Sequence, residues 1–223
     1  MQVRRFTRSE LVVHWTLALT VIAMILTGIA LGVNVGHAAA FPVHVGSVFV
    51  LAAGLVLVAL TGDRRAVVRT ARDLRTFRRD DRRWLAQASR IALRGGEGPP
   101  VGRFNAGQKL NTLLISALLL ASTASGLYWW AKLHGVFANS NLDGAIHNVA
   151  GVMIIVLVCG HLYMAVLNPA TREALRGITT GSVDAEWAAH HHAAWLAGLD
   201  GPTPPAAKPR PSSPTPAGRP RGG

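Results

Sequence analysis

The sequence predicts an all-α integral membrane protein: a four-helix transmembrane bundle with a cytoplasmic amphipathic helix and a disordered Pro-rich tail. Half of its 223 residues are apolar. The mean hydropathy is +0.29, which is unusual for a soluble domain that carries a net charge of +12. Four apolar stretches are each close to the roughly 20 residues that a bilayer core requires. These stretches are Leu11–Val33, Pro42–Leu60, Leu110–Trp130 and Ile146–Leu167.

The first predicted span follows a basic N-terminal segment. Arg4, Arg5 and Arg8 precede it, as basic residues precede the apolar part of a signal sequence. The apolar stretch is too long for a signal sequence, so we expect a retained helix that starts near Thr7–Ser9. The second span is expected to open at Pro42, because proline is tolerated in the first turn of a helix.

A long polar stretch, Gly62–Arg103, follows the second span and contains twelve arginines against five acidic residues. The positive-inside rule places such a loop in the cytoplasm, and with it both termini of a cell-membrane protein. Within the loop, Thr70–Leu93 is expected to form one amphipathic helix at the lipid headgroups. The charges crowd beside the spans without interleaved aromatic rings, so nucleic acid is not expected as a partner.

Two further spans and a tail complete the chain. Tyr128, Trp129 and Trp130 mark the end of the third span, because aromatic rings favour the membrane interface. The fourth span ends where Asn168–Pro169 interrupts the helix. From Gly201 the chain is too rich in proline and too poor in apolar residues to fold. We expect a membrane domain over residues 1–200 and a disordered cytoplasmic tail over residues 201–223.

Four histidines inside the spans are the candidate metal ligands. His147 and His161 lie fourteen residues apart, which is roughly 21 Å along a helix and within about 40° of the same direction. His14 lies on the cytoplasmic side, level with His161, and His44 lies on the outer side, level with His147. A titratable ring in hydrocarbon usually has a partner or ligand. Two facing imidazoles suit the iron of a low-spin haem, so we expect two such pairs.

Other polar and sulfur side chains are interpreted as structural. Cys159 excludes an intrachain disulfide and is expected in the bundle core. His37 and His134 lie in short connections and are expected to be exposed. The triplet His190–His192 resembles a metal-binding tract, but a solvated or headgroup-facing run is favoured. Glycines within the spans are interpreted as helix-packing residues rather than haem contacts: Gly28, Gly46, Gly54, Gly126, Gly151 and Gly160.

Several short motifs occur in order along residues 4–197. They are ExxxHW at Glu10–Trp15, RFNAGQK at Arg103–Lys109, IHxxAG at Ile146–Gly151, GHLYMA at Gly160–Ala165 and EWAAHHHAAW at Glu186–Trp195. With these motifs and the fourteen-residue histidine spacing, the chain resembles the membrane cytochrome b (gamma) subunit of respiratory formate dehydrogenases, a di-haem cytochrome b family.

The resemblance implies two haem b groups as cofactors. His44 and His147 would be the axial iron ligands of the outer haem. His14 and His161 would be the axial ligands of the inner haem.

The resemblance also implies a menaquinone site beside the inner haem. Asn105 and Gln108 would supply polar contacts, Gly107 would allow the quinone ring to approach, and the far nitrogen of His161 would bond a quinone oxygen. From the residues alone, Asn105 and Gln108 equally suit a cap at the start of the third span.

The implied role is that of a non-catalytic electron-transfer subunit of a formate dehydrogenase complex, a formate:quinone oxidoreductase. Electrons would come from an iron–sulfur beta subunit, which accepts them from a molybdenum-containing alpha subunit. Two alternatives stay open. One is the cytochrome b subunit of a nickel–iron hydrogenase or another quinone-linked dehydrogenase; the other is a haem-free membrane anchor or metal transporter. The oligomeric state is also open, a higher oligomer included.

Overall fold

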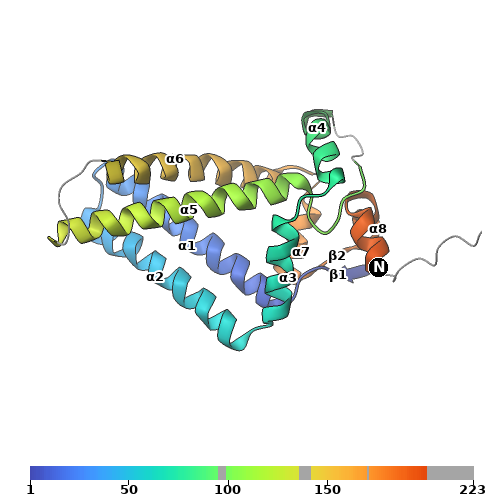
Figure 1. The fold of residues 1–223 in the computed structure, drawn as a ribbon, viewed down its shortest axis with the longest axis horizontal. Helices are drawn as coiled ribbons and strands as arrows, with labels where there is room; N and C mark the ends of the chain where they lie inside the picture. Colours follow the sequence, from blue (N-terminus) through green and yellow to red (C-terminus); the bar gives the residue numbers. More distant parts are fainter. Residues whose placement is uncertain (95–98, 136–141, 170, 200–223) are drawn as a thin grey trace, which may run out of the picture.

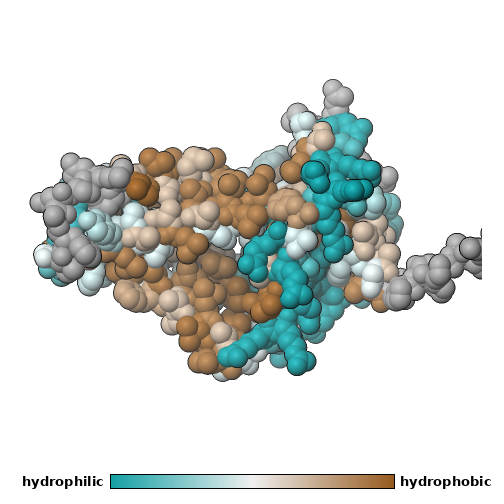
Figure 2. Space-filling view, in the orientation of Figure 1, coloured by the Kyte–Doolittle hydropathy of each residue, from teal (hydrophilic) through white to brown (hydrophobic). Residues whose placement is uncertain are grey.

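The computed structural model describes residues 1–94, 99–135, 142–169 and 171–199; the predicted Pro-rich tail lies outside them. Four of the described helices are long and apolar enough to cross a membrane. They are α1 (Arg8–Gly32), α2 (His37–Thr61), α5 (Ala106–Leu133) and α6 (Leu142–Leu162), the last continued by the π-helical turn η1 (Tyr163–Leu167). They run lengthwise as a bundle with an apolar surface (Figure 1, Figure 2). The predicted all-α membrane fold is confirmed.

Shorter elements gather at one end of the bundle (Figure 1). The helices among them are α3 (Arg64–Arg75), α4 (Arg79–Arg94), α7 (Glu173–Thr180), α8 (Ala185–His191) and α9 (Ala193–Leu199). Strand β1 (Gln2–Arg4) pairs antiparallel with β2 (Ser182–Asp184), and Val3 lies opposite Val183. The N-terminus is therefore attached to the segment that follows α6.

The starts of α1 and α2 have different causes. Thr7 caps α1, because its hydroxyl accepts from the Glu10 backbone N–H and its own N–H donates to the Glu10 carboxylate at 2.6 Å. This agrees with the predicted start. α2 begins at His37 rather than at the predicted Pro42. Gly36 turns the chain into the helix at φ 62°, and a proline at the sixth helical residue removes only one helical hydrogen bond.

The four spans form two tightly packed helical hairpins. α1 packs along α2 and α5 packs along α6, whereas the hairpins contact each other sparsely. In the most apolar 18 residues of each span, at most 11% of the residues are buried inside the protein. A helix against a filled core presents about three residues in seven to it. Most side chains of the spans are therefore not enclosed by the other described helices.

Gly54 and Cys159 show which helix faces are in contact. A Cβ atom at Gly54 would lie 2.6 Å from Cγ2 of Thr16, so this glycine permits the close approach of α1 and α2.

Cys159 is exposed, and its predicted position in the core is wrong. It follows the buried Ile154 by five residues, which places it about 140° around the helix from that face.

Two helices, α3 and α4, replace the single amphipathic helix predicted over Thr70–Leu93. The Lys109 ammonium donates to the Thr76 carbonyl at 2.9 Å, and the Asp81 carboxylate accepts from the Arg78 backbone N–H at 2.7 Å. Lys109 also pairs with Asp81 at 2.8 Å, with side chains only 9% and 6% exposed. The contacts of Lys109 on α5 with Thr76 and Asp81 therefore fix the break between α3 and α4.

We predict that Lys109→Met destabilises the protein by about 3–5 kcal/mol, because it leaves the Asp81 carboxylate buried without a partner. The double variant Lys109→Met/Asp81→Leu should recover most of this loss, since neither charge remains. The measurement is the denaturation midpoint of the full chain in detergent. Equal destabilisation of the single and double variants would contradict an electrostatic cause.

Candidate functional site

The four in-span histidines form two pairs, each between different helices. His14 on α1 faces His161 on α6 with ring centroids 6.3 Å apart and planes at 56°. His44 on α2 faces His147 on α6 with centroids 5.9 Å apart and planes at 66°. The structure therefore brings together the residues that the sequence analysis paired. α6 contributes one ring to each pair.

The hydrogen bonds of the His147 ring assign its free nitrogen. Its Nδ1 atom lies 2.8 Å from the Ser122 backbone carbonyl on α5. A carbonyl only accepts, so Nδ1 carries the proton and donates. Nε2 then keeps a lone pair for a metal, as in metal-binding histidines whose other ring nitrogen is held by a carbonyl.

Glycines on neighbouring helices pack against the rings of the His44–His147 pair. A Cβ atom at Gly28 would lie 3.3 Å from Cε1 of His44, and one at Gly126 would lie 2.9 Å from the His147 ring. The Thr27 hydroxyl also lies 3.0 Å from Nδ1 of His44. These two glycines, interpreted from the sequence as packing residues, therefore pack against histidine rings.

The distances within both pairs fit a shared metal ion. Bonds of about 2.0–2.1 Å from one ion to two imidazoles place the nitrogens about 4 Å apart and the ring centres roughly 6 Å apart. Each pair supplies two ligands. Haem iron needs two axial ligands because the macrocycle supplies the others, whereas protein zinc sites use three or four. Two imidazoles from different helices therefore fit haem better than zinc.

Asn105 and Gln108 form the cap of α5. The Asn105 side-chain oxygen accepts from the Gln108 backbone N–H at 2.9 Å, and the Gln108 side-chain oxygen accepts from the Asn105 backbone N–H at 3.0 Å. The capping interpretation is therefore confirmed. The cap occupies the two side-chain oxygens, so contact with a quinone would involve the NH₂ groups.

The space beside Gly107 is occupied by an indole ring. A Cβ atom at Gly107 would lie 2.9 Å from Cη2 of Trp84 on α4. The glycine therefore allows α4 to approach the start of α5. Its predicted contact with a quinone ring would have to be made beside Trp84.

A family model of the prokaryotic cytochrome b561 matches residues 5–181. The chain belongs to the prokaryotic cytochrome b561 family. This match includes all four paired histidines and all four spans. The protein is therefore a multi-pass membrane cytochrome of the electron-transfer type, and the family implies haem b.

Curated relatives of this cytochrome are formate dehydrogenase subunits. Matches are to the cytochrome b556(Fdn) subunit of nitrate-inducible formate dehydrogenase from Escherichia coli K12, E. coli O157:H7 and Shigella flexneri. Each is 27% identical over 117 residues, which is 50% of this chain and 52% of the relative. The match spans about half the length of these relatives, and the resemblance drawn from the motifs is confirmed.

A buried cluster of charges, which sequence reasoning missed, links α1, α3 and the segment before α5. Arg103 Nη2 pairs with Glu10 at 2.7 Å and donates to the Arg5 carbonyl at 2.6 Å. The Arg5 guanidinium in turn donates a hydrogen bond to the Arg103 carbonyl at 2.5 Å. Burial, with a contribution from the Arg103 charge, lowers the pKa of Arg5 to about 9. The cluster orders the end of the cytochrome where Asn105 and Gln108 lie.

The prediction that the triplet His190–His192 is solvated is wrong for His192. His190 and His191 are exposed, but His192 is 2% exposed and its Nδ1 lies 2.8 Å from the Gly102 carbonyl. Burial, with a contribution from the Arg5 charge, lowers the pKa of His192 to about 3. Among the described residues, no group of three or more His, Cys, Asp or Glu side chains could hold a metal ion.

We predict that this cytochrome loses stability as pH falls below about 6.5, the usual pKa of an unfolded histidine. The unfolded chain then binds a proton at His192 that the folded chain does not, which costs about 2 kcal/mol between pH 7 and pH 5. His192→Asn keeps a donor for the Gly102 carbonyl and removes the titration. Denaturation midpoints at the two pH values measure the effect.

His191→Asn is the matched control for this measurement. The loss of stability between pH 7 and pH 5 should be smaller in His192→Asn than in wild type and unchanged in His191→Asn. The same pH dependence in all three proteins would rule out His192 as its source.

Proposed function

We propose that this cytochrome is the membrane electron-transfer subunit of a formate dehydrogenase, carrying electrons from an iron–sulfur subunit through two b-type haems to menaquinone. The observation that carries the proposal is the pairing of His14 with His161 and of His44 with His147. The relatives named as formate dehydrogenase subunits support the choice of donor complex.

In this proposal the four histidines would hold the two haem irons. Haem iron bound by two imidazoles supplies reversible one-electron transfer. The Ser122 carbonyl fixes the tautomer of His147 and the orientation of its ring. On α6, His147 and His161 are about 21 Å apart along the helix axis, most of the roughly 30 Å hydrocarbon core. Haems held by the two pairs would therefore lie near opposite faces of the membrane.

The menaquinone site is proposed at the start of α5, beside the His14–His161 pair. α5 begins at the end of the bundle where α6 finishes (Figure 1). The NH₂ groups of Asn105 and Gln108 would donate to a quinone oxygen, and the far nitrogen of His161 would contact it. Gly107 would let the ring lie next to Trp84.

The proposed orientation of the protein rests on the positions of its arginines. The hydrophilic surface over α3 and α4 borders one end of the apolar bundle (Figure 2). From the positive-inside rule we propose that this end, and with it both termini, lies in the cytoplasm. Protons for menaquinol would then be taken from the cytoplasm, so electron transfer from a donor outside would separate charge across the membrane.

In the alternative, the same histidine pairs would carry electrons from a nickel–iron hydrogenase or another quinone-linked dehydrogenase. The formate dehydrogenase relatives favour formate over them. The match to a cytochrome family disfavours a haem-free anchor or metal transporter.

We predict two haem b groups per chain, measured by the pyridine haemochrome assay on purified protein. His44→Ala and His161→Ala should each reduce the haem content by about one, because each leaves one iron with a single axial ligand. His37→Ala, at an exposed histidine at the start of α2, should retain both haems. One haem in the wild type, or zinc in place of haem, would overturn the proposal.

We further predict that Asn105→Ser weakens menaquinone binding without unfolding α5. Serine keeps an oxygen for the cap but removes the NH₂ group. Loss of one hydrogen bond should reduce the affinity for a short-chain menaquinone analogue about five- to tenfold, measured by calorimetry. Thr7→Ser, the corresponding exchange at the cap of α1, should leave the affinity unchanged. An unchanged affinity in Asn105→Ser would limit that side chain to capping.

A further inference from the structure

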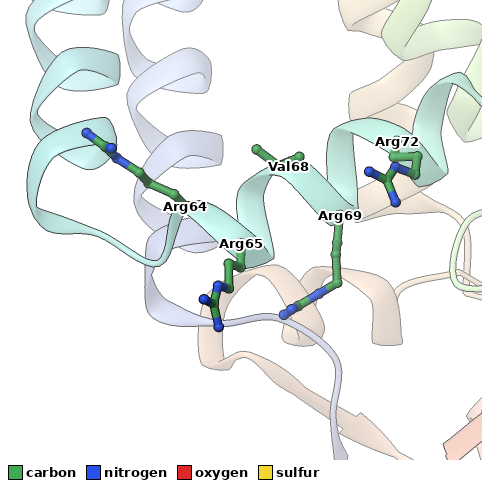
Figure 3. Close-up of a pocket in the computed structure, with 5 residues that line it drawn as sticks. All are labelled: Arg64, Arg65, Val68, Arg69 and Arg72. Carbon is green, nitrogen blue, oxygen red and sulfur yellow. The ribbon is translucent and has the colours of Figure 1, made fainter.

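The exposed face of α3 contains four arginines around a shallow pocket. Arg64, Arg65, Arg69 and Arg72 line the pocket together with Val68, and its volume is about 390 Å³. Figure 3 shows the Arg65 and Arg69 side chains extending to the same side of α3. This arrangement is independent of the histidine pairs and of the proposed quinone site.

The arginines of this pocket have no acidic partners among the described residues. None of the four guanidinium groups lies within 4.0 Å of a carboxylate there. Asp63 caps α3 through the Ala66 N–H at 3.0 Å, and Asp73 is the only acidic residue within α3. Like charges three and four residues apart on a helix repel one another. An anion in the pocket would relieve this repulsion.

The pocket lies where the apolar surface of the bundle ends. α2 finishes at Thr61, three residues before α3 begins, and its last turns expose Leu57 and Leu60 by 58% and 70%. Figure 2 shows the hydrophilic surface of this segment directly beside the apolar surface. A ligand seated here would meet arginines at one end and a lipid-facing helix at the other.

We propose that the α3 pocket binds the phosphate group of an anionic phospholipid whose acyl chains lie along α2. Guanidinium groups bind phosphate oxygens in a bidentate manner, which matches Arg65 and Arg69 on one side of α3 (Figure 3). Arg64 instead donates to the Ala59 carbonyl at the end of α2. Val68, exposed among the arginines, suits the apolar part of the lipid next to the headgroup. Free phosphate shares the headgroup chemistry, but only a lipid also uses Leu57 and Leu60.

Lipid binding would hold α3 across the end of the bundle. Thr70 on α3 donates to Glu10 and accepts from Arg103 at 2.7 Å. α3 thereby contacts the cluster that anchors α1 and the segment before α5. A lipid that bridges α2 and α3 would therefore stabilise the polar end of the cytochrome.

The test is native mass spectrometry of the full chain in detergent, titrated with dioleoylphosphatidylglycerol or with zwitterionic dioleoylphosphatidylcholine. We expect wild type to bind the anionic lipid about tenfold or more tightly than the zwitterionic one. Arg65→Gln/Arg69→Gln should weaken binding of the anionic lipid at least tenfold. Arg79→Gln/Arg82→Gln removes the same charge from exposed positions of α4 and should change binding less than about threefold. Inorganic phosphate at millimolar concentration should not displace the lipid.

Three results would overturn the proposal. Equal binding of the two lipids by wild type would exclude a site selective for an anionic headgroup, and this comparison needs no variant to fold. Equal losses in the two double variants would indicate diffuse attraction by net charge. Full displacement by inorganic phosphate would assign the pocket to free phosphate instead of lipid. Haem content is measured on the same samples, so a failure of the proposed function is recognised separately.

Discussion

Four imidazole rings within the hydrocarbon layer are the constraint on which this cytochrome depends. A polar ring there is costly without a partner. In the structure, the rings face each other in pairs. α6 contributes His147 and His161, while α1 and α2 supply the opposite rings. The Ser122 carbonyl holds the far nitrogen of His147. A haem held between each pair, as proposed, would give these rings a ligand.

The polar end of the molecule positions the start of α5 relative to the His14–His161 pair. Arg103, two residues before the Asn105 cap, is tied to Glu10 on α1, and Lys109 in the first turn of α5 is tied to Asp81 on α4. Buried ion pairs such as these add little net stability but are strongly destabilising to break. They hold Asn105 and Gln108 in place from both sides, and so connect the aqueous end with the proposed quinone site.

The spans and the histidine pairs could be predicted because both follow from local spacing. Fourteen residues return a helix to nearly the same face, so His147 and His161 share a direction whatever surrounds them. The division between α3 and α4 could not be predicted, because Lys109, more than thirty residues later, binds the Thr76 carbonyl. The burial of His192 depends similarly on the distant Gly102 carbonyl. The outward position of Cys159 depends on which face of α6 meets its neighbours.

Near-infrared magnetic circular dichroism of the oxidised, haem-loaded full chain tests the central claim most directly, because the charge-transfer band of low-spin ferric haem reports its axial ligands. The account predicts bis-histidine ligation for all of the bound iron. A histidine–methionine signal, or a high-spin signal from iron with one protein ligand, would show that the facing rings do not share a metal and would contradict the account.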